Sequence, residues 1–158
     1  VTGVQTCALP IYWIINMHYV TKRARFSACH RLHNPLLSDD ENVNIYDKCN
    51  NYNGHGHNYT LEVTVCGTPD PNTGYVIDLK KLKKIINKEI IEKVDHKHLN
   101  LDVDFLQNTI PTVENLLTAF WNILESKIFD GKLYRIRLFE TDDSYVEYFG
   151  NLEMLPKM

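Results

Sequence analysis

The strictest pattern in the chain is the alternation of apolar and polar side chains between residues 59 and 66. Such alternation predicts a β-strand that buries one face and keeps the other face polar. The apolar set is Tyr59, Leu61, Val63 and Val65, and the polar set is Thr60, Glu62, Thr64 and Cys66. The chain must therefore fold around a sheet with one apolar face, which other elements have to cover.

The segments around this strand predict three more strands and two helices. A weaker alternation predicts a strand over residues 18–29, and the polar residues 34–53 are expected to form a loop. Apolar residues at helical spacing follow Asp78, a suitable N-cap, and recur from about Thr112 to Phe129. Short strands at 133–140 and 145–149 close the chain across a polar turn. The helical apolar positions are Leu79, Leu82, Ile85, Ile86 and Ile90, then Leu116, Leu117, Phe120, Trp121, Leu124 and Ile128.

This element order, β, β, α, α, β, β, predicts one α+β domain with an antiparallel sheet. Two helices can cover one face of a four-stranded sheet, so the other face is left for solvent or a partner subunit. A sheet of this kind also has open edges, which natural proteins tend to pair or block. We therefore expect an oligomer that extends the sheet.

Length and composition bound the domain and its partners. We place the domain at residues 17–150 of the 158, and interpret residues 1–16 as a non-native or disordered leader and residues 151–158 as a C-terminal tail. A net charge of −3 argues against nucleic acid as the main partner, and no apolar run is long enough to span a membrane. The four cysteines form no Cys-x-x-Cys pair, which favours free thiols and a cytoplasmic location.

The segment from Cys49 to His57 points to metal chemistry. His55 and His57 are two residues apart, so an extended backbone places both imidazoles on one face. His30, near the end of the first predicted strand, is the candidate third ligand. Three imidazoles suit Zn²⁺ and leave a coordination position for water or substrate. Taken alone, a His-x-His pair has a simpler interpretation as two polar residues where a loop meets a strand.

Other residues are candidates for proton transfer or substrate binding. Cys49 lies in a polar, Asn-rich loop rather than a core environment, so it is a candidate base or nucleophile. Asp95-His96 follows the first helix; charge at a helix end is the favoured interpretation, and an acid–base pair is the alternative. Glu140 shares the alternation of an apolar strand face, where a carboxylate needs a partner or ligand. Its alternative is a solvated strand end.

Five motifs in order resemble the 6-pyruvoyl-tetrahydropterin synthase family, over nearly all of residues 17–150. They lie at residues 26–32, 49–59, 95–97, 112–115 and 140–142. The resemblance implies the tunnelling fold (T-fold), with a ββααββ subunit and an antiparallel sheet that closes into a barrel on trimerisation. It also implies a homohexamer, a dimer of trimers, with active sites between subunits.

The resemblance further implies a reaction and a role for each site residue. The reaction is the zinc-dependent elimination of triphosphate from 7,8-dihydroneopterin triphosphate, which gives 6-pyruvoyl-tetrahydropterin for tetrahydrobiopterin biosynthesis. The chain would then be a lyase with a small-molecule substrate. By residue-wise correspondence, the zinc ligands would be His30, His55 and His57, the general base Cys49, the relay Asp95 and His96 across a subunit interface, and the pterin pocket Glu140, Thr112 and Glu114.

The chain departs from the family pattern at four positions. Cys29 stands where a Ser is usual, Asp47 where Gly is common, Tyr52 where Pro is frequent, and Val113 where a second Thr is often found. None of these residues is a proposed ligand, base or pterin anchor. They bear on loop geometry and on the detail of the pterin pocket.

Two kinds of alternative remain. Sister activities on the same fold are 6-carboxy-tetrahydropterin synthase and a paralogue that cleaves the substrate side chain. The five residues between Cys49 and His55 argue against the first, and the presence of Cys49 argues against the second. A non-catalytic, zinc-stabilised interaction module would keep the histidines but would have no use for Cys49 or Asp95-His96.

Overall fold

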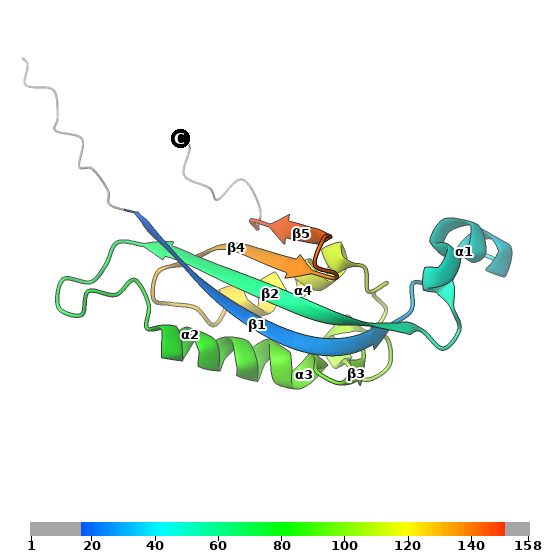
Figure 1. The fold of residues 1–158 in the computed structure, drawn as a ribbon, viewed down its shortest axis with the longest axis horizontal. Helices are drawn as coiled ribbons and strands as arrows, with labels where there is room; N and C mark the ends of the chain where they lie inside the picture. Colours follow the sequence, from blue (N-terminus) through cyan, green and yellow to red (C-terminus); the bar gives the residue numbers. More distant parts are fainter. Residues whose placement is uncertain (1–16, 151–158) are drawn as a thin grey trace, which may run out of the picture.

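The structure, a computed structural model, describes residues 17–150 of the chain. Five strands form one sheet in the order β3-β1-β2-β4-β5 (Figure 1). Their bounds are β1 His18–His30, β2 His55–Gly67, β3 Lys97–His98, β4 Lys132–Phe139 and β5 Tyr145–Tyr148. The predicted leader, residues 1–16, and the predicted tail, residues 151–158, lie outside the described residues.

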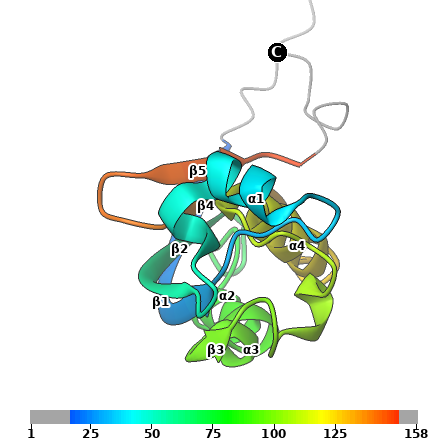
Figure 2. The same ribbon diagram turned by 90° about the vertical axis from the view of Figure 1, so that its right-hand side faces the viewer.

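Two helical segments pack against this sheet, on the same side of the β1–β2 pair (Figure 2). The first runs from α2 (Leu79–Ile86) through a π-helical turn (Asn87–Ile91) into α3 (Glu92–Val94). The second is α4 (Val113–Glu125), which packs against β4 and β5. Asp78 and Thr112 accept hydrogen bonds from the first-turn amides, so both predicted helix starts are confirmed.

The apolar core lies between the sheet and these helices. The four alternating residues Tyr59, Leu61, Val63 and Val65 are fully buried, which confirms the face assigned from the sequence. Burying one side chain of this size contributes about 1.5–3 kcal/mol, so the four together fix which way β2 faces. This fixed orientation decides where the side chains at the start of β2 point.

The opposite face of the sheet is polar and, among residues 17–150, no helix covers it. Glu62 is buried on this face and forms ion pairs with both Arg23 and Arg137. Arg137 forms a further ion pair with Glu147. The sheet also has two open edges within the described chain. β1 pairs on its outer side with β3 only at Ala28 and Cys29, and β5 has no outer partner.

Residues 34–53, predicted as a loop, contain a helix, so that prediction is wrong. α1 (Asp39–Tyr46) is followed by a 3₁₀ turn, η1 (Asp47–Asn50), and stands apart at one end of the sheet (Figure 1). Ser38 and Glu41 form a capping box at its start. α1 buries no apolar stripe, since Val43 and Ile45 are exposed, so the sequence of this segment has no helical periodicity. The Ser-x-x-Glu capping box is the local sequence pattern that indicates a helix here.

Three smaller expectations also need correction. Leu79, assigned to the apolar stripe, is 48% exposed because it occupies the first position after the N-cap. The second helix ends at Glu125 rather than Phe129, although Ile128 beyond it stays buried. β3 pairs with β1 in parallel, so the sheet is mostly rather than wholly antiparallel. A further 3₁₀ turn, η3, spans Asp104–Leu106.

Across residues 17–150, none of the helices combines the length and the apolar character needed to cross a membrane.

Candidate active site

Three histidines converge where β1 ends and β2 begins. His30 is the last residue of β1 and is the direct cross-strand partner of His55, the first residue of β2. His57 lies two residues further along β2 and therefore projects from the same face. The register of one antiparallel ladder thus brings together the three residues that the sequence selected as a group.

The ring nitrogens of these residues are spaced as a metal site requires. One nitrogen from each imidazole lies within 4.8 Å of the others, and Nε2 of His30 is 3.1 Å from Nε2 of His55. Two nitrogens bound to the same tetrahedral zinc ion would be about 3.3 Å apart, given Zn–N bonds of about 2.0–2.1 Å. The group, His30–His55–His57, could therefore bind a metal ion with little rearrangement.

The protonation of His30 is set by its neighbours. Its Nδ1 lies 2.8 Å from the carbonyl oxygen of Pro111, which can only accept, so Nδ1 carries the proton. Nε2 is then left with its lone pair directed toward His55. A backbone carbonyl that fixes the tautomer in this way is a common support for a metal-binding histidine. The residue before the N-cap of α4 thus orients the end of β1.

Buried nitrogens without partners further support this assignment. Within the described chain, four buried side-chain nitrogens have no hydrogen-bond partner, and two of them, His55 Nδ1 and His57 Nε2, belong to this group. A buried polar atom left unsatisfied costs about 1–3 kcal/mol, so such atoms are rare unless a ligand satisfies them. The donor set, three imidazoles, fits a divalent metal such as zinc.

The surroundings of His30 and His57 favour the neutral form of both imidazoles. Burial lowers the pKa of His30 below its ordinary value, and the neighbouring His55 acts in the same direction. Burial also lowers the pKa of His57, although the Glu140 carboxylate partly offsets this. Neutral imidazole is the form that binds a metal ion.

Glu140 closes one side of the group. Its Oε1 lies 3.4 Å from His30 Nε2 and 3.5 Å from His57 Nε2. With His30, Thr112 and Glu114 it lines a cavity of about 250 Å³ at the start of α4. The structure therefore gathers the three predicted pterin-pocket residues around one space that His30 also lines.

Cys49 lies on η1, near the same end of the sheet. Its side chain is half-buried rather than part of the core, and its carbonyl oxygen accepts a hydrogen bond from Leu32 N at 2.9 Å. Gly54, the residue before β2, has a φ of +73° and lies against the end of β1. A β-carbon at Gly54 would lie 2.8 Å from both Cys29 Sγ and His30 O, so only glycine permits this approach.

Asp95 and His96 lie beside Ser27, close to the end of β1 that carries His30. The pKa of Asp95 is lowered, chiefly because its carboxylate accepts a hydrogen bond from Ser27 N, and its Oδ1 is 3.1 Å from His96 Nδ1. No hydrogen bond or ion pair within the described chain joins either residue to the three histidines. The His96 side chain is 82% exposed and shares a cavity of about 430 Å³ with His57.

Sequence reasoning missed the polar residues that hold η1 in place. Asn50 is buried and contacts both Arg31 and His33, and Asn100 binds the backbone of Arg31. An Asn in an Asn-rich segment suggests a turn, so its composition gave no sign of burial. Only the position of Asn50, next to Cys49, marked it for attention.

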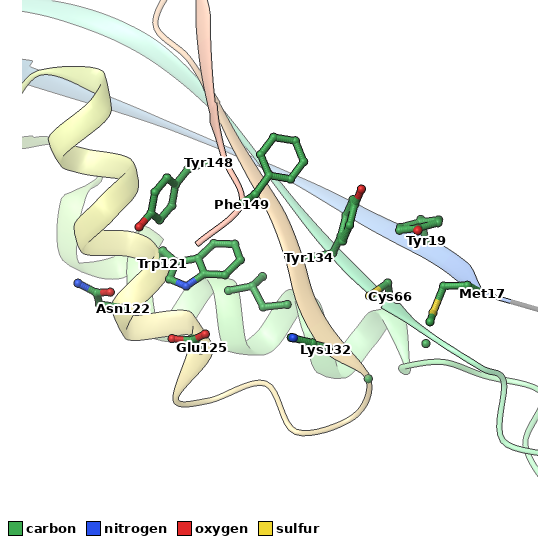
Figure 3. A pocket seen from close by; sticks show the side chains of 13 residues that line it. Met17, Tyr19, Cys66, Trp121, Asn122, Glu125, Lys132, Tyr134, Tyr148 and Phe149 are labelled. Carbon is green, nitrogen blue, oxygen red and sulfur yellow. The ribbon is translucent and has the colours of Figure 1, made fainter. Parts of the chain in front are cut away.

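A further cavity, of about 590 Å³, lies at the opposite end of the sheet (Figure 3). Aromatic side chains, including Tyr19, Trp121 and Tyr134, form much of its wall. No predicted site residue lines it. Burial raises the pKa of the Cys66 thiol in this wall, which favours its protonated, less reactive form. Cys66 fits the packing role that its strand position indicates.

Comparisons with known proteins agree with the geometry. The model of the family described as 6-pyruvoyl tetrahydropterin synthase matches residues 19–151. The 6-pyruvoyl tetrahydrobiopterin synthase of Homo sapiens is 44% identical over 83% of this chain and 90% of its own length. The structure of Caenorhabditis elegans 6-pyruvoyl tetrahydropterin synthase superposes with a TM-score of 0.82, at 39% identity, over 86% of this chain and 97% of that one.

Similarity also extends to a sister activity, but more weakly. The 6-carboxy-5,6,7,8-tetrahydropterin synthase of Rickettsia bellii is 27% identical over 80% of this chain and 96% of its own length.

Proposed function

The chain belongs to the 6-pyruvoyl tetrahydropterin synthase family and is a lyase of that kind, and we propose that it converts 7,8-dihydroneopterin triphosphate to 6-pyruvoyl-tetrahydropterin with zinc as cofactor. The observation that carries the zinc proposal is the His30–His55–His57 group with its unsatisfied buried nitrogens. The product would feed tetrahydrobiopterin biosynthesis.

In this proposal the three histidines hold the metal ion, and each is supported by the fold. His30 is oriented by Pro111, while His55 and His57 are oriented by the register of β2. When bound, the ion supplies Lewis acidity that stabilises negative charge on a substrate oxygen. Glu140 limits access from one side, and the cavity beside it offers the substrate an approach.

Cys49 is the proposed general base. The reaction needs a proton removed from a side-chain carbon that bears a hydroxyl group, and a thiolate held beside that carbon can accept it. The half-buried position of Cys49, on a turn next to the histidine end of the sheet, supports this role. The triphosphate then leaves with the electrons of its carbon–oxygen bond.

Glu140, Thr112 and Glu114 are the proposed pterin pocket. Their shared cavity beside His30 supports the assignment, since the ring and the side chain of one substrate must lie close to both groups. The carboxylates can accept hydrogen bonds from the amino and ring N–H groups at the edge of a pterin.

Asp95 and His96 are the proposed relay, acting on the Cys49 of a neighbouring subunit. The exposure of His96 and the lack of a contact to the histidine group within its own described chain support a role between subunits. Three copies would close a barrel by pairing the open β1 and β5 edges, and two such trimers would form the hexamer. A cytoplasmic location accords with the free thiols of Cys29, Cys49 and Cys66.

Product analysis tests the proposal. Zinc-loaded protein is incubated with 7,8-dihydroneopterin triphosphate, and the pterins and the released phosphate are separated. A 6-pyruvoyl product with one triphosphate released per turnover is expected. A 6-carboxy product, or a pterin that has lost its side chain, would move the chain to a sister activity. No turnover with metal bound would favour a non-catalytic zinc module.

A further inference from the structure

We propose that Asn50 is a positioning residue for Cys49: its buried side chain fastens the turn that carries the thiol to the end of the strand that carries His30. The inference rests on the proposed role of Cys49 as base. It assigns to Asn50 no contact with substrate or metal.

The first step is the set of hydrogen bonds that Asn50 makes. Its Oδ1 accepts from Arg31 Nε at 3.1 Å and from His33 Nδ1 at 3.0 Å. Arg31 Nε also lies 3.0 Å from the backbone oxygen of Asn50. Beside them, Leu32 N donates to the carbonyl oxygen of Cys49 at 2.9 Å. Three consecutive residues after His30 therefore hold the two residues at the end of η1.

The second step is that Arg31, which donates to Asn50, is itself held in place. Asn100 Oδ1 accepts from Arg31 N at 2.8 Å, and Asn100 Nδ2 donates to Arg31 O at 2.9 Å. This pair extends the strand hydrogen bonding of β1 by one residue through a side chain. The guanidinium of Arg31 also lies over the ring of Tyr52, 5.4 Å from its centroid. Asn50 therefore binds a residue whose backbone and side chain are both held by other contacts.

The third step is that η1 is held to the end of β1 by hydrogen bonds rather than by apolar packing. A 3₁₀ turn of four residues is weak by itself, and α1 before it contributes no apolar face to the core. Asn50 is the one residue of η1 that is buried. The position of the Cys49 thiol relative to the histidines therefore depends on a small set of hydrogen bonds, and Oδ1 of Asn50 accepts two of them.

Within the described chain, the hydrogen bonds of the Asn50 side chain are made by Oδ1, so this acceptor can be tested separately from the rest of the residue. Asn50→Ala removes the acceptor, whereas Asn50→Asp retains it. Asn42→Ala is the matched control, since Asn42 is also buried but its side chain binds carbonyl groups around the start of α1. His33→Ala removes one of the two donors and serves if Asn50→Ala does not fold.

Three quantities are measured on each zinc-loaded variant: metal content, the rate of iodoacetamide labelling at Cys49 by peptide mass mapping, and kcat and KM with 7,8-dihydroneopterin triphosphate. For Asn50→Ala we expect unchanged metal content, a labelling rate altered several-fold, and kcat reduced by about tenfold to a hundredfold with KM within about twofold. Asn50→Asp should restore most of both rates, His33→Ala should shift them less, and Asn42→Ala should leave both near wild type.

Wild-type kcat and labelling in Asn50→Ala would overturn the inference. So would an Asn50→Asp variant as impaired as Asn50→Ala, or an equal loss in Asn42→Ala, which would indicate general loosening. Labelling does not require the substrate, so it tests the clamp even if the proposed reaction fails.

Discussion

At the scale of single residues, the three histidines and the cysteine make separable predictions. For His55→Ala we expect bound metal to fall from about one ion per chain to well below half, because two imidazoles hold zinc far less tightly than three. Metal analysis after gel filtration measures this, and His18→Ala, at the far end of β1, is the control. An undiminished metal content would refute the ligand set.

Cys49→Ala should keep its metal and lose its turnover. Removal of a general base typically costs a factor of about 10² to 10⁴, so we expect a loss of that order in kcat. Cys66→Ala, in the aromatic cavity at the other end of the sheet, is the matched thiol control. Turnover close to wild type in the Cys49 variant would exclude the thiol as base.

Asp95 gives the molecule a defined response to acid. Its pKa is lowered in the folded state, first because Ser27 N donates to its carboxylate, so ionised Asp95 stabilises the fold above its ordinary pKa. That stabilisation is lost as the pH falls through the lower, folded pKa. The free energy of unfolding of wild type should therefore exceed that of Asp95→Asn at pH 7, and in urea titrations the difference should shrink as the pH falls below 3.8, the ordinary pKa of Asp. A difference independent of pH would mean that the charge of Asp95 does not contribute.

At the scale of elements, the turn that carries Cys49 contains a strained residue. Asp47 stands where the family commonly has glycine. Its backbone has φ 45° and ψ −124°, a region that residues other than glycine rarely adopt. Asp47→Gly should therefore raise the free energy of unfolding by about 1 kcal/mol or more. Asp47→Ala keeps the strain and removes only the carboxylate, so it should show no such gain. Equal effects of the two variants in denaturant titrations would rule out strain as the cause.

Elements with strong periodicity could be predicted from the sequence, and those held by single polar contacts could not. Strands β1, β2, β4 and β5, the helix starts at Asp78 and Thr112, and the buried face of β2 follow from the local sequence pattern. α1 and β3 do not, because a capping box and a two-residue pairing contain no repeat. The end of α4 could not be predicted either, because Ile128, three residues beyond it, is buried and continues the apolar spacing of the helix.

The candidate site divides in the same way. The gathering of His30, His55 and His57 could be predicted, because strand alternation places histidines two residues apart on one face. The hydrogen bond from His30 to Pro111 and the contacts of Asn50 could not. Both join segments far apart in the chain through groups with no distinctive sequence pattern. The proposed roles of Cys49, Asp95 and His96 stay predictions until variants are tested.

At the scale of the whole molecule, the open edges of the sheet predict self-association. β1 has most of its outer edge unpaired within residues 17–150, and the outer edge of β5 is likewise free of a partner strand there. Native mass spectrometry should therefore show three or six copies of the chain rather than one. A stable monomer that turns over substrate at the full rate would contradict both the assembly and the placement of His96 between subunits.

The pairing of His30 with His55 also bears on how the chain reaches its native state. A slip of one residue between β1 and β2 would turn both residues of the His-x-His pair to the opposite face and would leave His30 alone. Only the correctly aligned ladder then presents three donors to an ion. A metal ion that binds only this alignment would stabilise it relative to the slipped alignments. Metal supplied during refolding should therefore raise the yield of correctly folded protein as well as its final stability.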